Sequence, residues 1–366
     1  MAVARSSLAY SSYPGILYPA ASLVVVINGS GYSRQRRSWP KHDERPQMKT
    51  PRRPSLGDIS IFDLRSRIKN LRAADLGGLS DDTAAHRIRQ IIDQYAFQIR
   101  PLQLTGIYRA RPNKPGEIFS SASQLWYPPA ARVARPGRLN GIGQARFYGA
   151  NMPNTALLEL RPEPGNVFTV LIARTRSNKP ETINVAFIGL ERARAPDVQH
   201  LTDNDLFRHA SHFHDHLGHA NYKKWLLIDD YLSEIFGTIV PEGEEYKYKP
   251  TIALADLLFT APNLDAVNYP SVATEAYGIN VCMVPDKADQ FFVPGDAWMV
   301  ELGETAVHPQ SGEKLQRIHF LRRSREIGAD GIISWDAPGE GVNPDDIMRF
   351  ARHRMGSLAG WPLPGT

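Results

Sequence analysis

The order of the helical and strand patterns along the chain limits the fold more than any other sequence feature. Helical spacing at 58–100 is followed by apolar runs typical of buried strands at 167–173 and 183–190, and then by a second helical pattern at 201–237. These patterns do not alternate as they do in a doubly wound parallel sheet, and the short Gly141-Ile142-Gly143 is too weak a signal for a dinucleotide loop. The sequence therefore predicts an α+β fold.

Composition is ordinary for a soluble protein, and the cysteine usage fits a reducing cytosol. Apolar residues make up 42% of the 366 residues and charged residues 22%, and the length suffices for one large or two modest domains. Cys282 is the only cysteine, which excludes an intrachain disulfide and a zinc site with several cysteines. We expect a cytoplasmic protein.

The positive charge is concentrated at the N-terminus. Residues 1–56 carry nine Lys or Arg against two acidic residues, a charge of +7, and the total of +5 leaves −2 for the other 310 residues. Nucleic-acid binding is therefore not expected of the folded body. Prolines scattered among the basic residues indicate a disordered basic leader over 1–56.

An apolar run at 16–27 interrupts this leader. Its twelve residues fall short of the roughly twenty that span a bilayer, and no clear signal-peptide cleavage site follows it. We expect no membrane segment. A targeting role for this run and a true start at Met48 both remain open.

Two amphipathic helices are predicted over 57–100, as a small N-terminal module docked on the body. Gly77-Gly78 ends the first helix, and Ser80 caps the second. Their expected apolar faces are Leu64, Ile68 and Leu71 in the first helix, and Ile88, Ile91, Ile92 and Tyr95 in the second. The main domain is expected over 101–345, with a helical insertion at 201–237, and a C-terminal tail over 346–366.

The stretch from 107 to 160 is too polar, and too rich in Pro, Gly and Asn, to be ordinary core. Asn154 is expected to cap a short helix that carries a carboxylate. The side chains in this stretch suit a phosphorylated nucleotide, with cations for its phosphates and a carboxylate for its sugar: Arg109, Arg111, Arg138, Tyr148 and Glu159.

Several of these residues stand in motifs that resemble the RES domain family, which is named for an Arg, a Glu and a Ser. The resemblance covers roughly 105–340. Its motifs are Tyr108-Arg109, Gly137-Arg138-x-Asn140, Tyr148, Thr155-Ala156 with Glu159, and Tyr269-Pro270-Ser271-Val272 with Gly278 and Asn280. It implies a fold similar to ADP-ribosyltransferases, a split mixed sheet with a nucleotide cleft, here with a helical N-terminal extension.

RES domains are known chiefly as toxins of toxin–antitoxin pairs that consume NAD by splitting its nicotinamide–ribose bond. The resemblance implies that Arg109 and Arg138 hold the NAD phosphates, because a guanidinium donates to them in a bidentate fork. Arg111 lies on the same strand face as Arg109 and could replace it. Tyr148 would stack on a base and offer its hydroxyl as a polar handle.

Glu159 lies among leucines, where a carboxylate is costly to bury unless it is paired or functional. The resemblance implies that it stabilises the positive ribose as nicotinamide leaves. The alternative is a solvent-facing residue paired with Arg161. Ser271 is not expected to be a nucleophile, because no G-x-S-x-G surrounds it. It would orient the ribose, the acceptor or Glu159, or else simply cap a turn.

A histidine-rich segment at 209–219 is an alternative candidate site, for a metal ion. His212 and His216 are four residues apart, as in metal-binding helices, but a solvated helical insertion is the simpler interpretation. We therefore expect no metal and no cofactor, with NAD as a consumed substrate.

Three functions stay open. The first is a toxin-like NAD glycohydrolase or phosphorylase, whose partners would be NAD and an antitoxin protein. The second is an ADP-ribosyltransferase that modifies a macromolecule. The third is a catalytically inactive binding module.

Overall fold

The computed structural model describes residues 23–26, 59–92, 95–189, 217–273, 278–307 and 314–339. The fold is α+β, as predicted. The strands are β1 (Leu23–Val26), β2 (Ala96–Leu104), β3 (Gly106–Pro112), β4 (Phe147–Ala150), β5 (Val167–Thr175), β6 (Glu181–Phe187), β7 (Ala266–Pro270), β8 (Ile279–Met283), β9 (Phe292–Val307), β10 (Lys314–Ile327) and β11 (Ile333–Trp335). The helices are α1 (Ile61–Arg72), α2 (Asp81–Ile92), α3 (Pro153–Leu158), α6 (His219–Gly237), α7 (Lys249–Leu258) and α8 (Pro285–Phe291), with 3-10 turns η1 (Ala122–Gln124), η2 (Ala130–Arg132) and η3 (Glu245–Tyr248).

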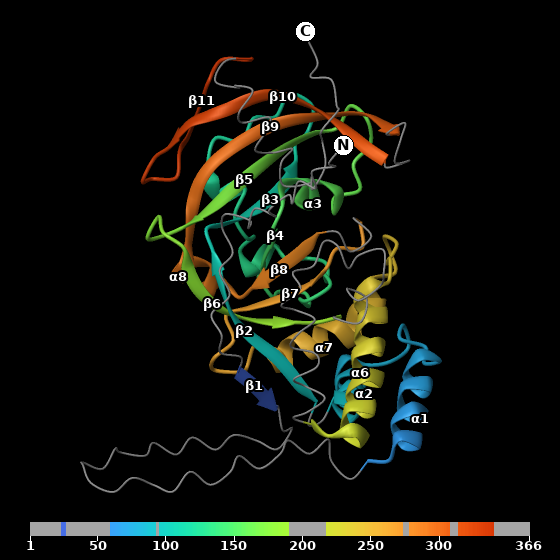
Figure 1. Ribbon diagram of the computed structural model, residues 1–366. Helices are drawn as coiled ribbons and strands as arrows, with labels where there is room; N and C mark the ends of the chain where they lie inside the picture. The colour runs from blue at the N-terminus through green and yellow to red at the C-terminus, as the bar shows by residue number, and fades with distance from the viewer. Residues whose placement is uncertain are drawn as a thin grey trace, which may run out of the picture.

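The strands form one mixed sheet that is split near its middle. Its order is β1-β2-β6-β7-β8-β4-β3-β5-β9-β10-β11, with β6 and β7 parallel. Between β3 and β4 only Tyr108 and Ala150 pair, whereas β3 pairs with β5 along its full length. Figure 1 shows β3, β5, β9 and β10 above this split and β4, β8, β7, β6 and β2 below it. This agrees with the predicted split mixed sheet.

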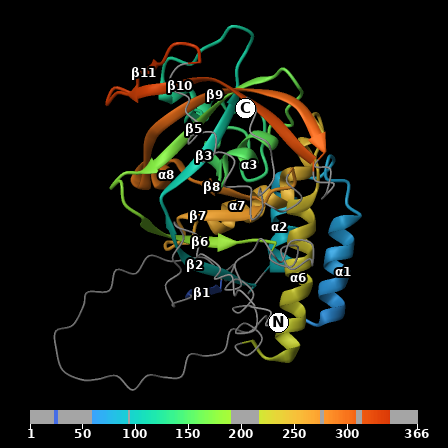
Figure 2. The same cartoon turned by 45° about the horizontal axis from the view of Figure 1, so that its top comes forward.

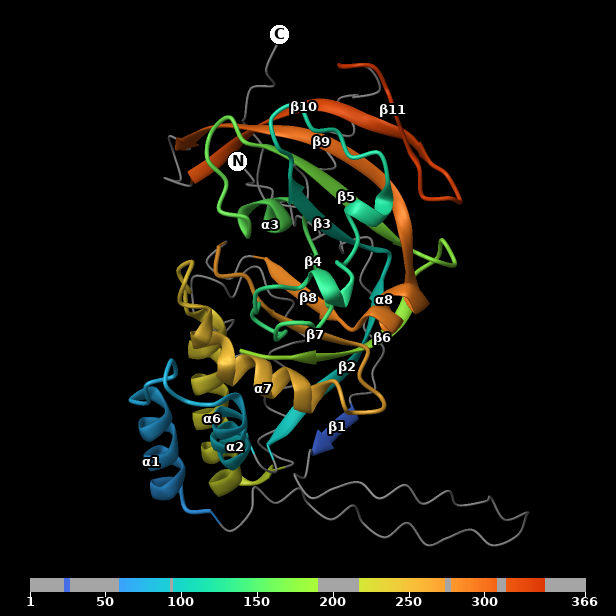
Figure 3. The ribbon, with the colours of Figure 1, turned by 180° about the vertical axis from the view of Figure 1, so that it is seen from behind.

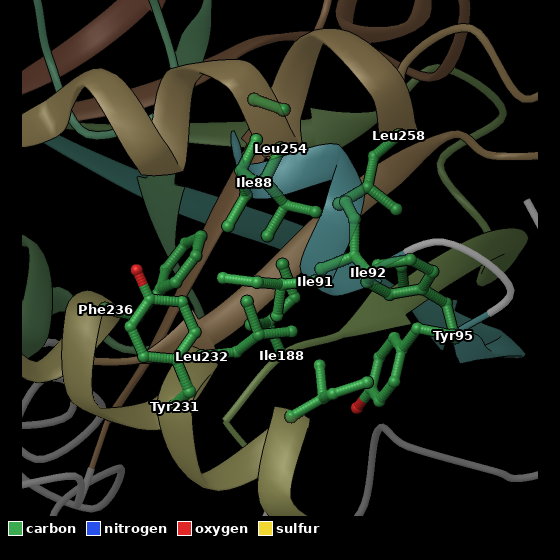
Figure 4. Packing of buried hydrophobic residues seen from close by; sticks show 14 of the residues in the cluster. Ile88, Ile91, Ile92, Tyr95, Ile188, Tyr231, Leu232, Phe236, Leu254 and Leu258 are labelled. Carbon is green, nitrogen blue, oxygen red and sulfur yellow. The ribbon is translucent and has the colours of Figure 1, made fainter. Parts of the chain in front are cut away.

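Helices α1, α2, α6 and α7 pack beside the lower half of the sheet (Figures 1 and 2). The residues predicted as the apolar faces of the first two helices are buried, and Ser80 caps α2 by accepting a 3.2 Å bond from the Thr83 amide. Figure 4 shows Ile88, Ile91 and Ile92 of α2 among side chains of α6 and α7. The two N-terminal helices therefore share one core with the body. Truncating one of these isoleucines to Ala should cost about 2–5 kcal/mol.

Helix α3 connects the upper half of the sheet to the split. Its Ala156 and Leu157 pack in a cluster with Val170 of β5 and Trp298 of β9. Seen from behind, α3 lies between the β9–β10 layer and the lower strands (Figure 3). The residue that follows α3 is Glu159, which is thereby placed near the junction of the two halves.

The structure corrects two boundaries and leaves others outside the described residues. Residues 96–100, expected to belong to the helical module, begin β2, because Phe97 and Ile99 are buried at the two-residue spacing of a strand. The disordered leader is wrong for Leu23–Val26, which pair with β2. The remainder of 1–56, residues 201–216 of the insertion and the tail at 346–366 lie outside the described residues. Residues 219–237 are helical, as predicted. None of the helices described is long and apolar enough to cross a membrane.

Candidate active site

A pocket of about 630 Å³ opens at the split in the sheet. This volume is typical of small-molecule sites. Its lining residues are Arg109, Ala110, Arg138, Tyr148, Gly149, Ala156, Leu158, Glu159, Leu160, Arg161, Pro162, Ile239, Tyr248, Tyr269, Val272, Ala273 and Asn280. Three arginines and one glutamate give the lining a net positive charge, which favours an anionic ligand.

Four of the five predicted site residues, Arg109, Arg138, Tyr148 and Glu159, line this one pocket. Ser271, the fifth, is not among the lining residues and is buried, with 1% of its surface exposed. It comes directly after β7, and its amide donates to the Gly278 carbonyl at 2.8 Å. The sequence motifs, more than 160 residues apart at their ends, therefore converge in space.

Close packing between Thr155 and Gly278 brings α3 against the start of β8. A Cβ on residue 278 would lie 1.9 Å from Oγ1 of Thr155, so a side chain there would force the two segments apart. Asn151 adds two bonds to the same strand: its amide donates to the Ile279 carbonyl at 3.0 Å, and its Oδ1 accepts from the Ile279 amide at 2.9 Å. These contacts fix the end of α3 beside Ser271 and Asn280.

Asn154 does not cap α3, contrary to the sequence prediction. The N-cap is Met152, which makes no side-chain cap bond, and Pro153 takes the first turn. Proline has no amide hydrogen to satisfy and its fixed φ suits this position, so the helix can begin two residues earlier than predicted.

The Glu159 carboxylate is held through one oxygen. Ser271 Oγ donates to Oε1 at 2.5 Å and Asn280 Nδ2 donates to the same atom at 2.7 Å. Oε2 makes no hydrogen bond with any residue that the structure describes. Two donors on one oxygen fix the direction of the carboxylate and leave the second oxygen for a ligand.

The surroundings of Glu159 differ from the sequence interpretation in one respect. Its leucine neighbours do not bury it: Leu157 points into the core, whereas Glu159 is exposed in the pocket. This exposure agrees with the solvent-facing alternative, but the pairing of that alternative with Arg161 is not observed. Nη2 of Arg161 donates to the Val240 carbonyl at 3.2 Å, and no ion pair joins it to Glu159 in the described structure.

Arg109 bridges the two halves of the sheet. From β3, its Nη1 donates to the Tyr148 carbonyl on β4 at 2.6 Å and its Nε to the Leu125 carbonyl at 3.0 Å. Burial, and after it the charge of Arg111, lower the pKa of Arg109 to about 9, which leaves it charged at neutral pH. Arg111 donates to the Trp126 carbonyl at 3.0 Å, and of the two arginines only Arg109 is among the lining residues described above.

Arg138 holds the end of α6. Its Nη1 and Nη2 donate to the carbonyls of Ile235 and Thr238 at 3.3 and 3.1 Å, and its guanidinium lies 5.3 Å from the centroid of the Tyr248 ring. An arginine has five N–H donors, so donors remain for a ligand in the pocket. The residue is thus part of the wall and not a free surface side chain.

The hydroxyl of Tyr148 is already engaged, which corrects its predicted use as a handle for the ligand. It donates to Asn140 Oδ1 at 2.8 Å and accepts from the Leu139 amide at 2.8 Å. Burial raises the pKa of Tyr148 well above its usual value, so the hydroxyl stays neutral. Asn140 and Gly137 therefore serve to hold this ring: a Cβ on Gly137 would meet Asn140 Oδ1 at 2.5 Å. The ring itself lines the pocket.

Several lining residues were not singled out for the site from sequence, among them Arg161, Ile239, Tyr248 and Tyr269. Tyr269 stands in the Tyr269-Pro270-Ser271-Val272 motif, and Arg161 is only two residues beyond Glu159, so both were within reach of the motif. Ile239 and Tyr248 carry no local signal. They reach the pocket because α6 and α7 pack on the lower half of the sheet.

The metal alternative gains no support from the described residues, which contain no cluster of three His, Cys, Asp or Glu side chains suited to a metal ion. His209, His212, His214 and His216 lie outside the described part of the chain, and His219 begins α6.

Comparison with known proteins gives one result. The model of the RES domain matches residues 107–303, just over half of the chain, and this range includes all five predicted site residues. No curated protein matches the sequence.

Proposed function

Because the chain belongs to the RES domain family, we propose that it is an enzyme that consumes NAD by breaking the bond between nicotinamide and ribose. The observation that carries this proposal is the arrangement of Glu159. Two donors fix Oε1, while Oε2 stays without a described partner in a residue that lines a pocket rich in arginine.

The reaction begins with cleavage of the C1′–N bond of the nicotinamide riboside. The bonding electrons pass to the pyridinium nitrogen, and nicotinamide leaves as a neutral molecule. Positive charge develops on the ribose, and a carboxylate beside it lowers the energy of that state. The oxygen of water then attacks C1′ and releases a proton, which gives ADP-ribose. With inorganic phosphate as the acceptor, the product is ADP-ribose 1-phosphate.

The pyrophosphate of NAD is held by arginines in this proposal. Arg109 and Arg138 retain N–H donors beyond those bound to backbone carbonyls, and both line the pocket. The Tyr148 ring offers a flat apolar face for stacking. Since three guanidinium groups face one carboxylate, a ligand with two phosphate charges is better matched than a neutral one.

Ser271 and Asn280 act through Glu159. Their side chains are buried, with 1% and 4% of the residue surface exposed, and both donate to the carboxylate. We therefore assign them as positioning residues that keep the Glu159 carboxylate correctly directed.

A toxin role, with an antitoxin protein as partner and the cytoplasm as the place of action, follows from the family alone. Expression of the active chain in bacteria should deplete cellular NAD and stop growth, and the Glu159→Gln variant should do neither. Normal growth and a normal NAD content in cells that express the active chain would contradict the toxin role. That result would leave the proposed cleavage of NAD by the purified protein unaffected.

The exposure of Glu159 also favours a second candidate, transfer of ADP-ribose to a macromolecule, because an acceptor larger than water could reach an open site. NAD labelled in its adenosine part separates the candidates. Label in free ADP-ribose or its phosphate supports the NAD-consuming enzyme, and label retained on a protein supports the transferase.

The test of the proposed function is nicotinamide release from NAD by the purified protein, with and without added phosphate. We expect stoichiometric release of nicotinamide, and a requirement for phosphate would assign phosphorolysis. Intact NAD after incubation with folded protein would overturn the proposal and favour an inactive binding module.

A further inference from the structure

The connector between α6 and α7, residues 238–248, forms a wall of the pocket that the family motifs do not include. Two of its side chains, Ile239 and Tyr248, line the pocket. Both come from the sequence between Glu159 and Ser271 that also contains the helical insertion. The connector that follows the insertion therefore contributes directly to the site.

Two pocket arginines fix the backbone of this connector. Arg138 donates to the carbonyl of Thr238 at 3.1 Å, and Arg161 donates to the carbonyl of Val240 at 3.2 Å. These carbonyls lie on either side of Ile239. The position of the Ile239 side chain is thus coupled to the two guanidinium groups.

Ile239 is directed away from the core. Thr238 is extended, with φ −74° and ψ 130°, so successive side chains in this segment point in opposite directions. Val240 is buried, with 7% of its surface exposed, whereas Ile239 is 62% exposed and faces the pocket. A flat apolar group that covered Ile239 would remove this surface from water.

Arg161 links the segment of Glu159 to the connector that carries Ile239. Arg161 follows Glu159 by two residues along the chain, and its Nη2 reaches the carbonyl next to Ile239. In a dinucleotide the pyrophosphate separates the two ribosides. If the reacting ribose lies at Glu159 and the phosphates at the arginines, the base that reaches Ile239 is the one farther from the reacting bond.

We propose that Ile239, together with the Tyr248 ring that also lines the pocket, forms the subsite for the adenine base of the dinucleotide. The Arg138 guanidinium holds both parts of this subsite, because it bonds to the Thr238 carbonyl and stacks on Tyr248. This assignment rests on the proposed function. It makes Ile239 a specificity-determining residue that binds the substrate without taking part in bond cleavage.

Steady-state kinetics of Ile239→Ser with two substrates test the assignment. Nicotinamide mononucleotide has the same reacting bond as NAD but lacks adenosine. We expect Ile239→Ser to raise KM for NAD about tenfold at unchanged kcat, since it removes apolar contact area that ground and transition states share. The constants for nicotinamide mononucleotide should not change.

Two further variants serve as controls. Ile239→Leu keeps the apolar surface and should retain the KM of the parent protein. Ile332→Ser makes the same chemical change at an isoleucine that is 56% exposed and outside the pocket lining, and it should leave both substrates unaffected. Equal losses with both substrates, or no change with NAD, would overturn the adenine assignment.

Binding measurements keep this test separate from that of the proposed function. In the Glu159→Gln background, calorimetry with ADP-ribose should show affinity about tenfold weaker when Ile239→Ser is added. If the parent protein leaves NAD intact but this loss is seen, the cleavage reaction is wrong and the subsite stands. If NAD is cleaved but ADP-ribose binds equally to both variants, the subsite is wrong and the reaction stands.

Discussion

Ser271 donates a hydrogen bond of 2.5 Å to Oε1 of Glu159, although 112 residues separate the two along the chain. Asn280 donates to the same oxygen at 2.7 Å. A carboxylate held in this way cannot rotate freely, so its second oxygen keeps a fixed position in a residue that lines the pocket. The position of one atom, Oε2 of Glu159, therefore depends on side chains that a ligand need not touch.

Ser271→Ala should reduce kcat about 10- to 100-fold with little change in KM, because a hydrogen bond to a charged group contributes about 1.5–3 kcal/mol. Asn280→Ala should act in the same direction. Since both donors bind one oxygen, the double variant should lose less than the product of the two single losses. Steady-state kinetics of the four proteins measure this coupling. An unchanged kcat in Ser271→Ala, or an effect confined to KM, would contradict the positioning role.

Gly278→Ala should separate α3 from β8 and lower both stability and activity. The new Cβ would lie 1.9 Å from Thr155 Oγ1, and overpacking of this kind costs about 1–3 kcal/mol. Thermal unfolding with and without Thr155→Ala checks the cause. Gly278→Ala should lower the melting temperature less in the Thr155→Ala background, because Oγ1 and Cγ2 of Thr155 are absent there. Equal destabilisation in both backgrounds would show that this contact is not responsible.

Arg138→Lys should be about as damaging as Arg138→Ala. A lysine ammonium group cannot donate to the Ile235 and Thr238 carbonyls as the guanidinium does, and it stacks poorly on the Tyr248 ring. Both variants should raise KM for NAD at least about tenfold and lower the melting temperature. Arg132→Ala changes an exposed arginine nearby and is the matched control. Full activity in Arg138→Lys would mean that charge alone is needed there.

Cys282 should resist alkylation in the folded protein. It lies on β8 opposite Tyr148, fully buried, and burial raises the pKa of its thiol to about 12. Iodoacetamide at pH 8 should therefore modify it only when the chain unfolds, at a rate that urea increases. Rapid modification without denaturant would show that the β4–β8 pair opens readily.

The same thiol gives a pH dependence of stability. Between its ordinary value and the raised pKa of about 12, the folded state holds a proton that the unfolded state has lost. The free energy of unfolding should therefore decrease as pH rises from about 9 toward 12. Cys282→Ala should reduce this slope, and urea titrations across that pH range measure it. An identical slope in both proteins would exclude the thiol as its source.

Local patterns predicted the two N-terminal helices correctly, because spacing and caps can be read from neighbouring residues alone. Leu64, Ile68 and Leu71 recur at helical spacing, and Ser80 stands where a cap is needed, so neither requires knowledge of the partner surface. The start of β2 was missed for the opposite reason. Phe97 and Ile99 show strand alternation, but they follow an amphipathic helix closely, and a short run of this kind is ambiguous without its neighbour β6.

The candidate site could be predicted only in part. The motifs identified Glu159 and Ser271, and the structure adds how they meet, through the close approach of Thr155 and Gly278. The engagement of the Tyr148 hydroxyl with Asn140 depends on how a loop folds back, which no spacing reveals. Ile239 could not have been found from sequence, since the packing of α6 and α7 decides which residues of their connector face the pocket.

Nicotinamide release by the parent protein, Glu159→Gln and Glu163→Gln tests the central claim most directly. Glu163 is an exposed carboxylate four residues beyond Glu159 and outside the pocket lining, so it controls for a loss of charge in the same segment. We predict release by the parent and by Glu163→Gln, and a rate about 10³-fold lower in Glu159→Gln at unchanged melting temperature. Equal rates in all three proteins, or no release by any of them, would contradict the assignment of Glu159 as the catalytic carboxylate of an NAD-consuming enzyme.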